Sequence, residues 1–88
     1  MELEDFVRFC YKGFLDGKPF ERIAEEACQE FRIEYDLSYR LLKPVYWFYS
    51  RNNRPFDFDL AVRRLLDEYE ETLEARLKAW KSDHPRLF

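Results

Sequence analysis

The residue types that most often carry out chemistry in proteins are few in this chain. It contains two cysteines, Cys10 and Cys28, and one histidine, His84. A structural zinc site needs about four such ligands at close spacing, and the two cysteines form no CxxC pair. The sequence therefore predicts no metal site and no cofactor. Both cysteines fall on apolar stripes of predicted helices, which is typical of small buried residues with free thiols.

Nucleophilic catalysis and phosphate binding have equally little support in the sequence. A nucleophilic serine needs a general base and a sharply turned backbone, and Ser38, Ser50 and Ser82 lie in no such setting. A phosphate-binding loop needs several glycines, and the chain has only Gly13 and Gly17. We therefore expect a protein that is not an enzyme.

The densest aromatic segment is the run Tyr-Trp-Phe-Tyr over residues 46–49. Successive side chains on a helix turn by about 100°, so four in a row cannot all face one core. Part of this surface must meet a further helix, a second subunit or a ligand. Tyrosine, tryptophan and arginine are also enriched at the centres of protein interfaces. The residues that we predict to bind a partner are Tyr46, Trp47, Tyr49, Arg51 and Arg54.

Length and composition favour one small domain that carries more apolar side chains than its interior can hold. The chain has 88 residues, of which 47% are hydrophobic and 19% aromatic. A single domain over residues 1–88 buries roughly 60–65% of the surface that its unfolded chain exposes. The surplus favours burial against a partner protein or a second copy of the chain.

The expected location is the cytoplasm. No segment approaches the roughly 20 consecutive apolar residues that a membrane-spanning helix needs. The first residues are acidic, and no apolar segment of the kind found in signal peptides follows them. Reduced cysteines suit the same compartment.

The middle of the chain is basic although the whole chain is acidic. The formal net charge is −3, but residues 32–64 carry seven bases against four acids. The helices predicted on either side of residues 32–35 are joined as in a helix-turn-helix, and aromatic rings between arginines suit stacking on single-stranded bases. Against this, the turn has no glycine, and Glu34 and Asp36 place negative charge beside it. Nucleic-acid binding is therefore the alternative hypothesis, with contacts that include Arg40, Lys43, Arg63 and Arg64.

Apolar residues at intervals of three and four predict four helices and an all-α fold. Glycine and proline after the first stripe and the polar segment 50–56 mark the ends of elements. Aspartates are common helix N-caps, so they mark the expected beginnings of the third and fourth helices. We expect helices over residues 2–16 and 19–31, a third helix capped by Asp36, and a long C-terminal helix from Asp57 or Asp59 to about residue 82.

Pro44 conflicts with the apolar stripe of the third helix. An interior proline lacks the backbone N–H that would bind the carbonyl four residues earlier, and its ring crowds that carbonyl. It also disfavours the helical conformation of the residue before it. We therefore expect the third helix to be bent at Pro44, or to end there so that a second short helix begins.

The predicted C-terminal helix is much longer than the other three. About 25 residues extend nearly 40 Å along a helix axis, and the apolar stripe follows this whole length. Its second half should either overhang into a partner or receive the aromatic run across it. We predict a non-catalytic protein-interaction or regulatory module that forms a homodimer through this helix. The predicted self-association residues are Tyr69, Leu73, Leu77 and Trp80.

Overall fold

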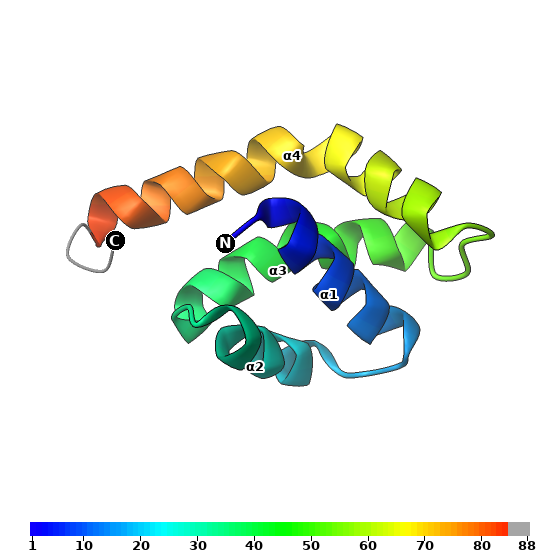
Figure 1. Cartoon of the computed structure of the whole chain (residues 1–88), viewed down its shortest axis with the longest axis horizontal. Coiled ribbons are helices and arrows are strands. Elements are labelled where there is room, and N and C mark those ends of the chain that lie inside the picture. Colours follow the sequence, from blue (N-terminus) through cyan, green and yellow to red (C-terminus); the bar gives the residue numbers. More distant parts are fainter. Residues whose placement is uncertain (85–88) are drawn as a thin grey trace.

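A computed structural model describes residues 1–84, and these residues form four α-helices without a strand. The predicted all-α fold, with three shorter helices and one long C-terminal helix, is confirmed (Figure 1). Residues 85–88 of the expected single domain lie outside the described part. In chain order the helices are α1 (Leu3–Leu15), α2 (Phe20–Phe31), α3 (Tyr35–Arg51) and α4 (Phe58–Asp83).

The helices are arranged in three layers. α1 and α3 contact each other and form the middle layer, and each of them also contacts both α2 and α4. In the described residues α2 and α4 make no contact, so they cover opposite sides of the α1–α3 pair. Figure 1 shows α4 arching along one side of this pair and α2 lying on the other. The outward face of α3 near α2 is therefore not covered by the long helix.

The apolar stripes of all four helices meet in one core. Each stripe repeats at intervals of three and four residues, which is the spacing that keeps side chains on one face of a helix. Tyr11 joins this core although it is a tyrosine, because its hydroxyl donates a hydrogen bond to the backbone carbonyl of Asn52. The core includes Phe6, Val7, Cys10 and Phe14 of α1, Ile23 and Ala27 of α2, Leu37, Leu41, Val45 and Phe48 of α3, and Val62, Leu65, Leu73 and Trp80 of α4.

Gly13 allows α1 and α2 to approach closely. A Cβ atom at this position would lie 3.0 Å from Ile23 Cγ1, which is closer than packed carbon atoms normally come. Gly17 then ends α1 with a φ of 85°, in the left-handed region that favours glycine. The Lys18 N–H binds the Gly13 carbonyl at 3.1 Å, so a tight turn leads directly into α2.

The other helix ends lie close to the expected ones, except at the start of α3. α2 ends at Phe31 and is followed by Arg32, whose φ of 53° is unusual for a residue with a side chain. α3 begins at Tyr35, so Asp36 lies in its first turn and is not its N-cap, which is a correction to the prediction. Asp57 is the N-cap of α4, and its side chain accepts a hydrogen bond from the Leu60 N–H at 3.2 Å.

α3 is one continuous helix through Pro44. Of the two predicted alternatives, a bend or a break at this proline, the break does not occur. Pro44 leaves the Arg40 carbonyl without its usual backbone donor. Arg76 of α4 fills this role, because its Nη1 atom donates a hydrogen bond to the Arg40 carbonyl at 3.0 Å. A side chain of the long helix thus completes the hydrogen bonding of α3 where the proline interrupts it.

Candidate functional site

The described surface contains an aromatic groove of about 630 Å³. It lies between the end of α1, the turn from α1 to α2, and the face of α3 that α4 leaves uncovered. We use the term aromatic groove for this site below. It is lined by Phe14, Lys18, Pro19, Phe20, Glu21, Tyr39, Lys43, Tyr46, Trp47 and Tyr49.

The local sequence explains how these side chains come together. On α3, Tyr39, Lys43 and Tyr46 follow one another at intervals of four and three, so they share one face of the helix. This face lies beside the buried stripe of the same helix. The tight turn at Gly17 brings Phe14 and Phe20 close to each other, with ring centroids 6.1 Å apart. Three segments therefore supply one continuous set of rings.

The rings pack against one another in the manner of a core. Phe14 stacks on Tyr49 with centroids 5.1 Å apart and ring planes 17° apart, and it also contacts Tyr46 at 5.4 Å. Phe20 meets Tyr39 edge-on at 5.0 Å and Tyr46 edge-on at 5.9 Å. Such pairs each stabilise a structure by about 0.5–1.5 kcal/mol beyond their buried area. The floor of the groove is therefore formed before any ligand binds.

Much of this aromatic surface remains open to solvent. Tyr46 is 44% exposed and Trp47 is 42% exposed, whereas Phe14 below them is buried. Within residues 1–84, the hydroxyl groups of Tyr39, Tyr46 and Tyr49 have no protein hydrogen-bond partner, unlike the hydroxyls of Tyr11 and Tyr69. The groove thus combines exposed rings with free polar edges.

Two lysines line the groove, and their surroundings differ. Lys43 Nζ lies 5.0 Å from the centroid of the Tyr39 ring, in the position of a cation over an aromatic face. Lys18 Nζ is bound to Glu26 Oε1 at 2.7 Å, and this hydrogen bond lowers the pKa of the Glu26 carboxyl. Lys43 forms no ion pair within the part of the chain that the structure describes. The charge of Lys43 is therefore available to a ligand.

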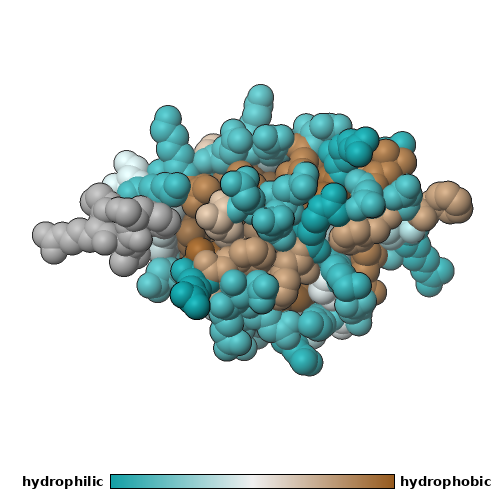
Figure 2. Space-filling view, viewed as in Figure 1, coloured by the Kyte–Doolittle hydropathy of each residue, from teal (hydrophilic) through white to brown (hydrophobic). Residues whose placement is uncertain are grey.

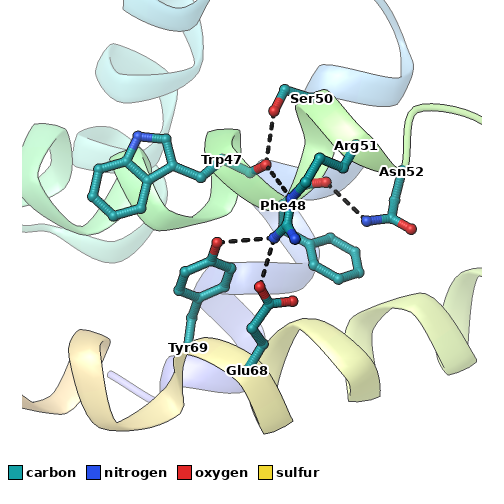
Figure 3. A network of polar contacts seen from close by, with 7 residues as sticks. All are labelled: Trp47, Phe48, Ser50, Arg51, Asn52, Glu68 and Tyr69. Atoms are coloured by element: carbon teal, nitrogen blue, oxygen red, sulfur yellow. Dashed lines mark hydrogen bonds and ion pairs between the residues drawn. The ribbon is translucent and has the colours of Figure 1, made fainter.

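Arg51 is held by α4 and does not line the groove. Its Nη2 atom donates hydrogen bonds to Glu68 Oε1 at 2.6 Å and to the Tyr69 hydroxyl at 2.9 Å (Figure 3). The hydrogen bond with Glu68 raises the pKa of the Arg51 guanidinium. This network fixes the end of α3 to the middle of α4.

Trp47 contacts both the groove and the long helix. Its ring centroid lies 6.2 Å from that of Tyr69, and the Arg76 guanidinium lies 5.2 Å from the same ring. The sequence left open whether the second half of the long helix overhangs into a partner or packs against the aromatic run. In the structure α4 packs against part of this run, through Trp47.

The structure brings together three of the five predicted partner-binding residues. Tyr46, Trp47 and Tyr49 line the aromatic groove. Arg51 is bound to α4, and Arg54 lies in the loop between α3 and α4, where it lines a separate hollow. The five predicted residues therefore lie in three places, and the aromatic groove holds three of them.

The predicted self-association stripe is mostly not available for contact with a second copy. Leu73 is fully buried and Trp80 is 3% exposed, so both belong to the core of the chain itself. Contact with a second copy through α4 stays a prediction, and it would have to use the other two residues of the stripe. Leu73 and Trp80 are covered because α4 runs along one side of the α1–α3 pair and contacts both helices (Figure 1). Tyr69 and Leu77 are only partly buried.

Leu77 borders a second hollow, at the N-terminal end of α1. It lies there together with Met1, Leu3 and Leu66, between flanking glutamates. Figure 2 shows one face of the molecule, on which hydrophobic residues reach the surface between groups of hydrophilic ones. Apolar surface is therefore exposed beside α4 as well as in the aromatic groove.

The residues predicted to contact nucleic acid do not form one basic surface. Arg40 pairs with Asp36 at 3.3 Å, and its guanidinium lies 5.6 Å from the Trp80 ring. Lys43 lines the groove, whereas Arg63 and Arg64 are exposed on α4. Ser38, near the start of the helix that would read DNA, is buried and donates to the Ala24 carbonyl at 2.9 Å.

The sequence reasoning missed the part of the groove that α1 and α2 supply. Phe14, Phe20 and Lys18 were not among the predicted site residues. Lys43 was assigned only to the nucleic-acid alternative, and Tyr39 was not among its named contacts. The spacing of Tyr39, Lys43 and Tyr46 is the signal that could have revealed this face of α3.

The reactive side chains are placed as structural residues. Burial raises the pKa of the Cys10 thiol strongly, and burial is also the largest cause that raises the pKa of Cys28. Both shifts disfavour the thiolate that a nucleophile needs. His84 stacks on Trp80 with centroids 3.7 Å apart.

Among residues 1–84, no group of three acidic, histidine or cysteine side chains is placed to hold a metal ion. In the same residues, no helix has the length and apolar character needed to cross a membrane.

Comparisons with protein-family models, with curated proteins and with solved structures each gave no match. The functional argument therefore rests on the geometry of the aromatic groove.

Proposed function

We propose that this chain is a non-catalytic interaction module and that a segment of a partner protein binds in the aromatic groove. The observation that supports this most is the exposure of Tyr46 and Trp47, at 44% and 42%, on the rim of a groove of about 630 Å³. Covering apolar surface contributes about 25 cal/mol per Å², and aromatic side chains carry much of the binding energy at interfaces. A binding module in a reducing compartment such as the cytoplasm is consistent with the free thiols of Cys10 and Cys28.

A protein ligand is favoured over a nucleic acid by the charges around the groove. A nucleic acid needs several bases that contact phosphates. Arg40 and Arg51 are instead paired with acids, Lys18 is bound to Glu26, and Glu21 lines the groove itself. Only Lys43 of the groove is left to neutralise a phosphate.

Self-association through α4 is a second part of the proposal, and it uses a smaller surface than the sequence suggested. Leu77 and Leu66 border the second hollow at the start of α1, and Tyr69 is partly exposed. We expect light scattering to give the mass of a dimer at both low and high salt, and Leu77→Glu to give the mass of a monomer. A monomer mass for the unchanged protein at both salt concentrations would refute this part.

Selection of peptides from a random display library tests the binding function. The unchanged protein is the bait, and each selected peptide is measured against Tyr46→Ala and Phe56→Ala. Phe56 is a matched control because it is a fully exposed aromatic residue that lies outside the groove, in the loop before α4. Circular dichroism and thermal unfolding confirm that each variant is folded. Lys43→Glu replaces Tyr46→Ala if the latter fails to fold.

We expect selected peptides to bind the unchanged protein and Phe56→Ala equally, and to bind the groove variant at least tenfold more weakly. If no peptide is selected, or if all bind the groove variant as tightly as the control, the groove is not a binding site and the proposal is wrong.

A further inference from the structure

We propose that the ligand of the aromatic groove is an acidic, proline-containing peptide in the polyproline II conformation. This inference rests on the proposed binding function and names the chemistry of the partner. Three features of the groove support it: its polar edges, the spacing of its rings, and its free charge.

Most polar groups that line the groove can donate a hydrogen bond. The hydroxyls of Tyr39 and Tyr46 can each donate as well as accept, and the Lys43 ammonium can only donate. Glu21 is the one carboxylate among the described lining residues. A ligand that matches these edges should present acceptors and few N–H groups.

A polyproline II segment has this balance of groups. Its backbone carbonyls form no internal hydrogen bonds, so they remain free to accept from the groove. Each proline also lacks a backbone N–H, so it brings no donor that the groove would have to satisfy. A helical ligand would fit less well, because its backbone carbonyls are already bound within the helix.

The spacing of the rings agrees with the repeat of this conformation. Tyr39 and Tyr46 lie seven positions apart on α3, which is about 10 Å along the axis of a helix. One turn of polyproline II has three residues and advances about 9 Å. Two prolines three positions apart can therefore each cover one tyrosine, and the Phe20 ring, in contact with both tyrosines, fills the space between.

The Lys43 charge provides a site for one carboxylate of a ligand, whereas the several phosphates of a nucleic acid would find no further unpaired base among the described lining residues. Lys43 lies between Tyr39 and Tyr46 in sequence and on the same face, and it forms no ion pair in the described residues. A carboxylate beside either proline can reach it. Lys18 contributes less, because Glu26 already neutralises it.

Titration of the full chain with synthetic peptides tests this inference. The probe is a nine-residue peptide with two prolines three positions apart and two glutamates. One comparison peptide has alanine in place of both prolines, and a second has lysine in place of both glutamates. Binding is followed by the amide and indole NMR signals of the groove and by calorimetry, with a short oligothymidylate as the nucleic-acid probe.

We expect the probe to shift the signals of Tyr46 and Trp47 and to bind at least fivefold more tightly than the alanine peptide. Lys43→Glu should reverse the preference, so that the lysine peptide binds more tightly than the glutamate peptide. Arg63→Glu is the matched control, because Arg63 is exposed on α4 and outside the groove, and the preference should stay unchanged.

Three results would overturn the inference. The first is equal binding of the proline and alanine peptides. The second is a groove that responds to the oligothymidylate and not to the peptides. The third is a set of display-selected peptides that depend on Tyr46 but contain no proline, which would leave the proposed binding function intact. Failure of the display selection itself would remove both.

Discussion

Arg76 should stabilise this fold by supplying the hydrogen bond that Pro44 cannot donate. Substitutions at both positions, made singly and together, can test this. Pro44 removes the backbone donor of the Arg40 carbonyl, and Arg76 Nη1 supplies a donor at 3.0 Å. Replacing Arg76 by methionine keeps most of the side-chain stem but removes this donor. Replacing Pro44 by alanine restores a backbone N–H at the position from which a helix normally supplies it.

The expected magnitudes follow from the contacts of Arg76. A hydrogen bond from a charged group contributes about 1.5–3 kcal/mol when water is excluded, and about 1 kcal/mol is a reasonable value at this exposed site. The cation–π contact with Trp47 contributes about 0.5–1 kcal/mol. Arg76→Met should therefore destabilise the protein by about 1.5–2 kcal/mol. In the Pro44→Ala background only the contact with Trp47 is lost, and the cost should fall to about 0.5–1 kcal/mol.

The single change Pro44→Ala should have a small net effect. A proline inside a helix costs about 3 kcal/mol relative to alanine. Against this gain, the buried Pro44 ring loses about two methylene groups, at about 0.8 kcal/mol each, and the unfolded chain gains about 0.4–1 kcal/mol of conformational freedom. We expect the variant to lie within about 1 kcal/mol of the unchanged protein.

Urea unfolding of the four proteins, followed by circular dichroism at 222 nm, measures the coupling between the two positions. Circular dichroism is preferable to tryptophan fluorescence because Arg76 lies against Trp47. The matched control is Arg63→Met, which removes an exposed arginine of the same helix and should change the unfolding free energy by less than about 0.5 kcal/mol. We expect a coupling of about 1 kcal/mol, and a value below about 0.3 kcal/mol would mean that Arg76 does not replace the missing donor.

Three further predictions concern positions outside the groove. Arg32→Gly should stabilise the protein by about 0.5–1 kcal/mol, because the φ of 53° suits glycine, whereas Glu25→Gly in the middle of α2 should destabilise it by about 1 kcal/mol; equal effects in chemical denaturation would contradict the reasoning. Ellman's reagent should modify the partly exposed Cys28 at least about 100-fold faster than the buried Cys10 in native protein. Rapid modification of Cys10 in the folded Cys28→Ala variant would refute this. Burial raises the pKa of Tyr11, so the folded protein resists its ionisation and stability should fall as pH rises above the unfolded pKa of about 10. Tyr11→Phe should show a smaller alkaline fall in the free energy of unfolding between pH 9 and pH 11, and an unchanged fall would show that Tyr11 does not contribute to it.

The elements of this fold were accessible from the sequence because local signals and apolar periodicity agree over most of the chain. Gly17 and Asp57 end and begin helices through the backbone geometry and capping that their residue types favour. Pro44 could be interpreted in two ways, because the choice between a bent and a broken helix depends on a donor from α4, 32 positions away in sequence. Arg32 shows the same limit, since no local rule places an arginine in the left-handed region.

The candidate site was accessible only in part, because its two halves come from different helices. The aromatic run predicted a surface role for Tyr46, Trp47 and Tyr49, since four rings in succession cannot share one face. The sequence around Phe14 and Phe20 does not distinguish a ring that fills the core from a ring that forms the floor of a groove. Their role follows from the tight turn between α1 and α2, which sets both rings against the same face of α3.

The position of α4 explains why the same aromatic surplus gives both a core and an open groove. α4 covers one side of the α1–α3 pair and buries Leu73 and Trp80 there, while α2 covers only part of the other side. Trp47 lies at the border between these two regions, with its ring against Tyr69 and Arg76 on one side and the groove on the other. The long helix is therefore needed to hold one wall of the groove as well as to complete the core. The variant Arg76→Met also tests this role of α4. A change in the NMR signal of the Trp47 indole without loss of the fold would show that α4 positions this wall of the groove.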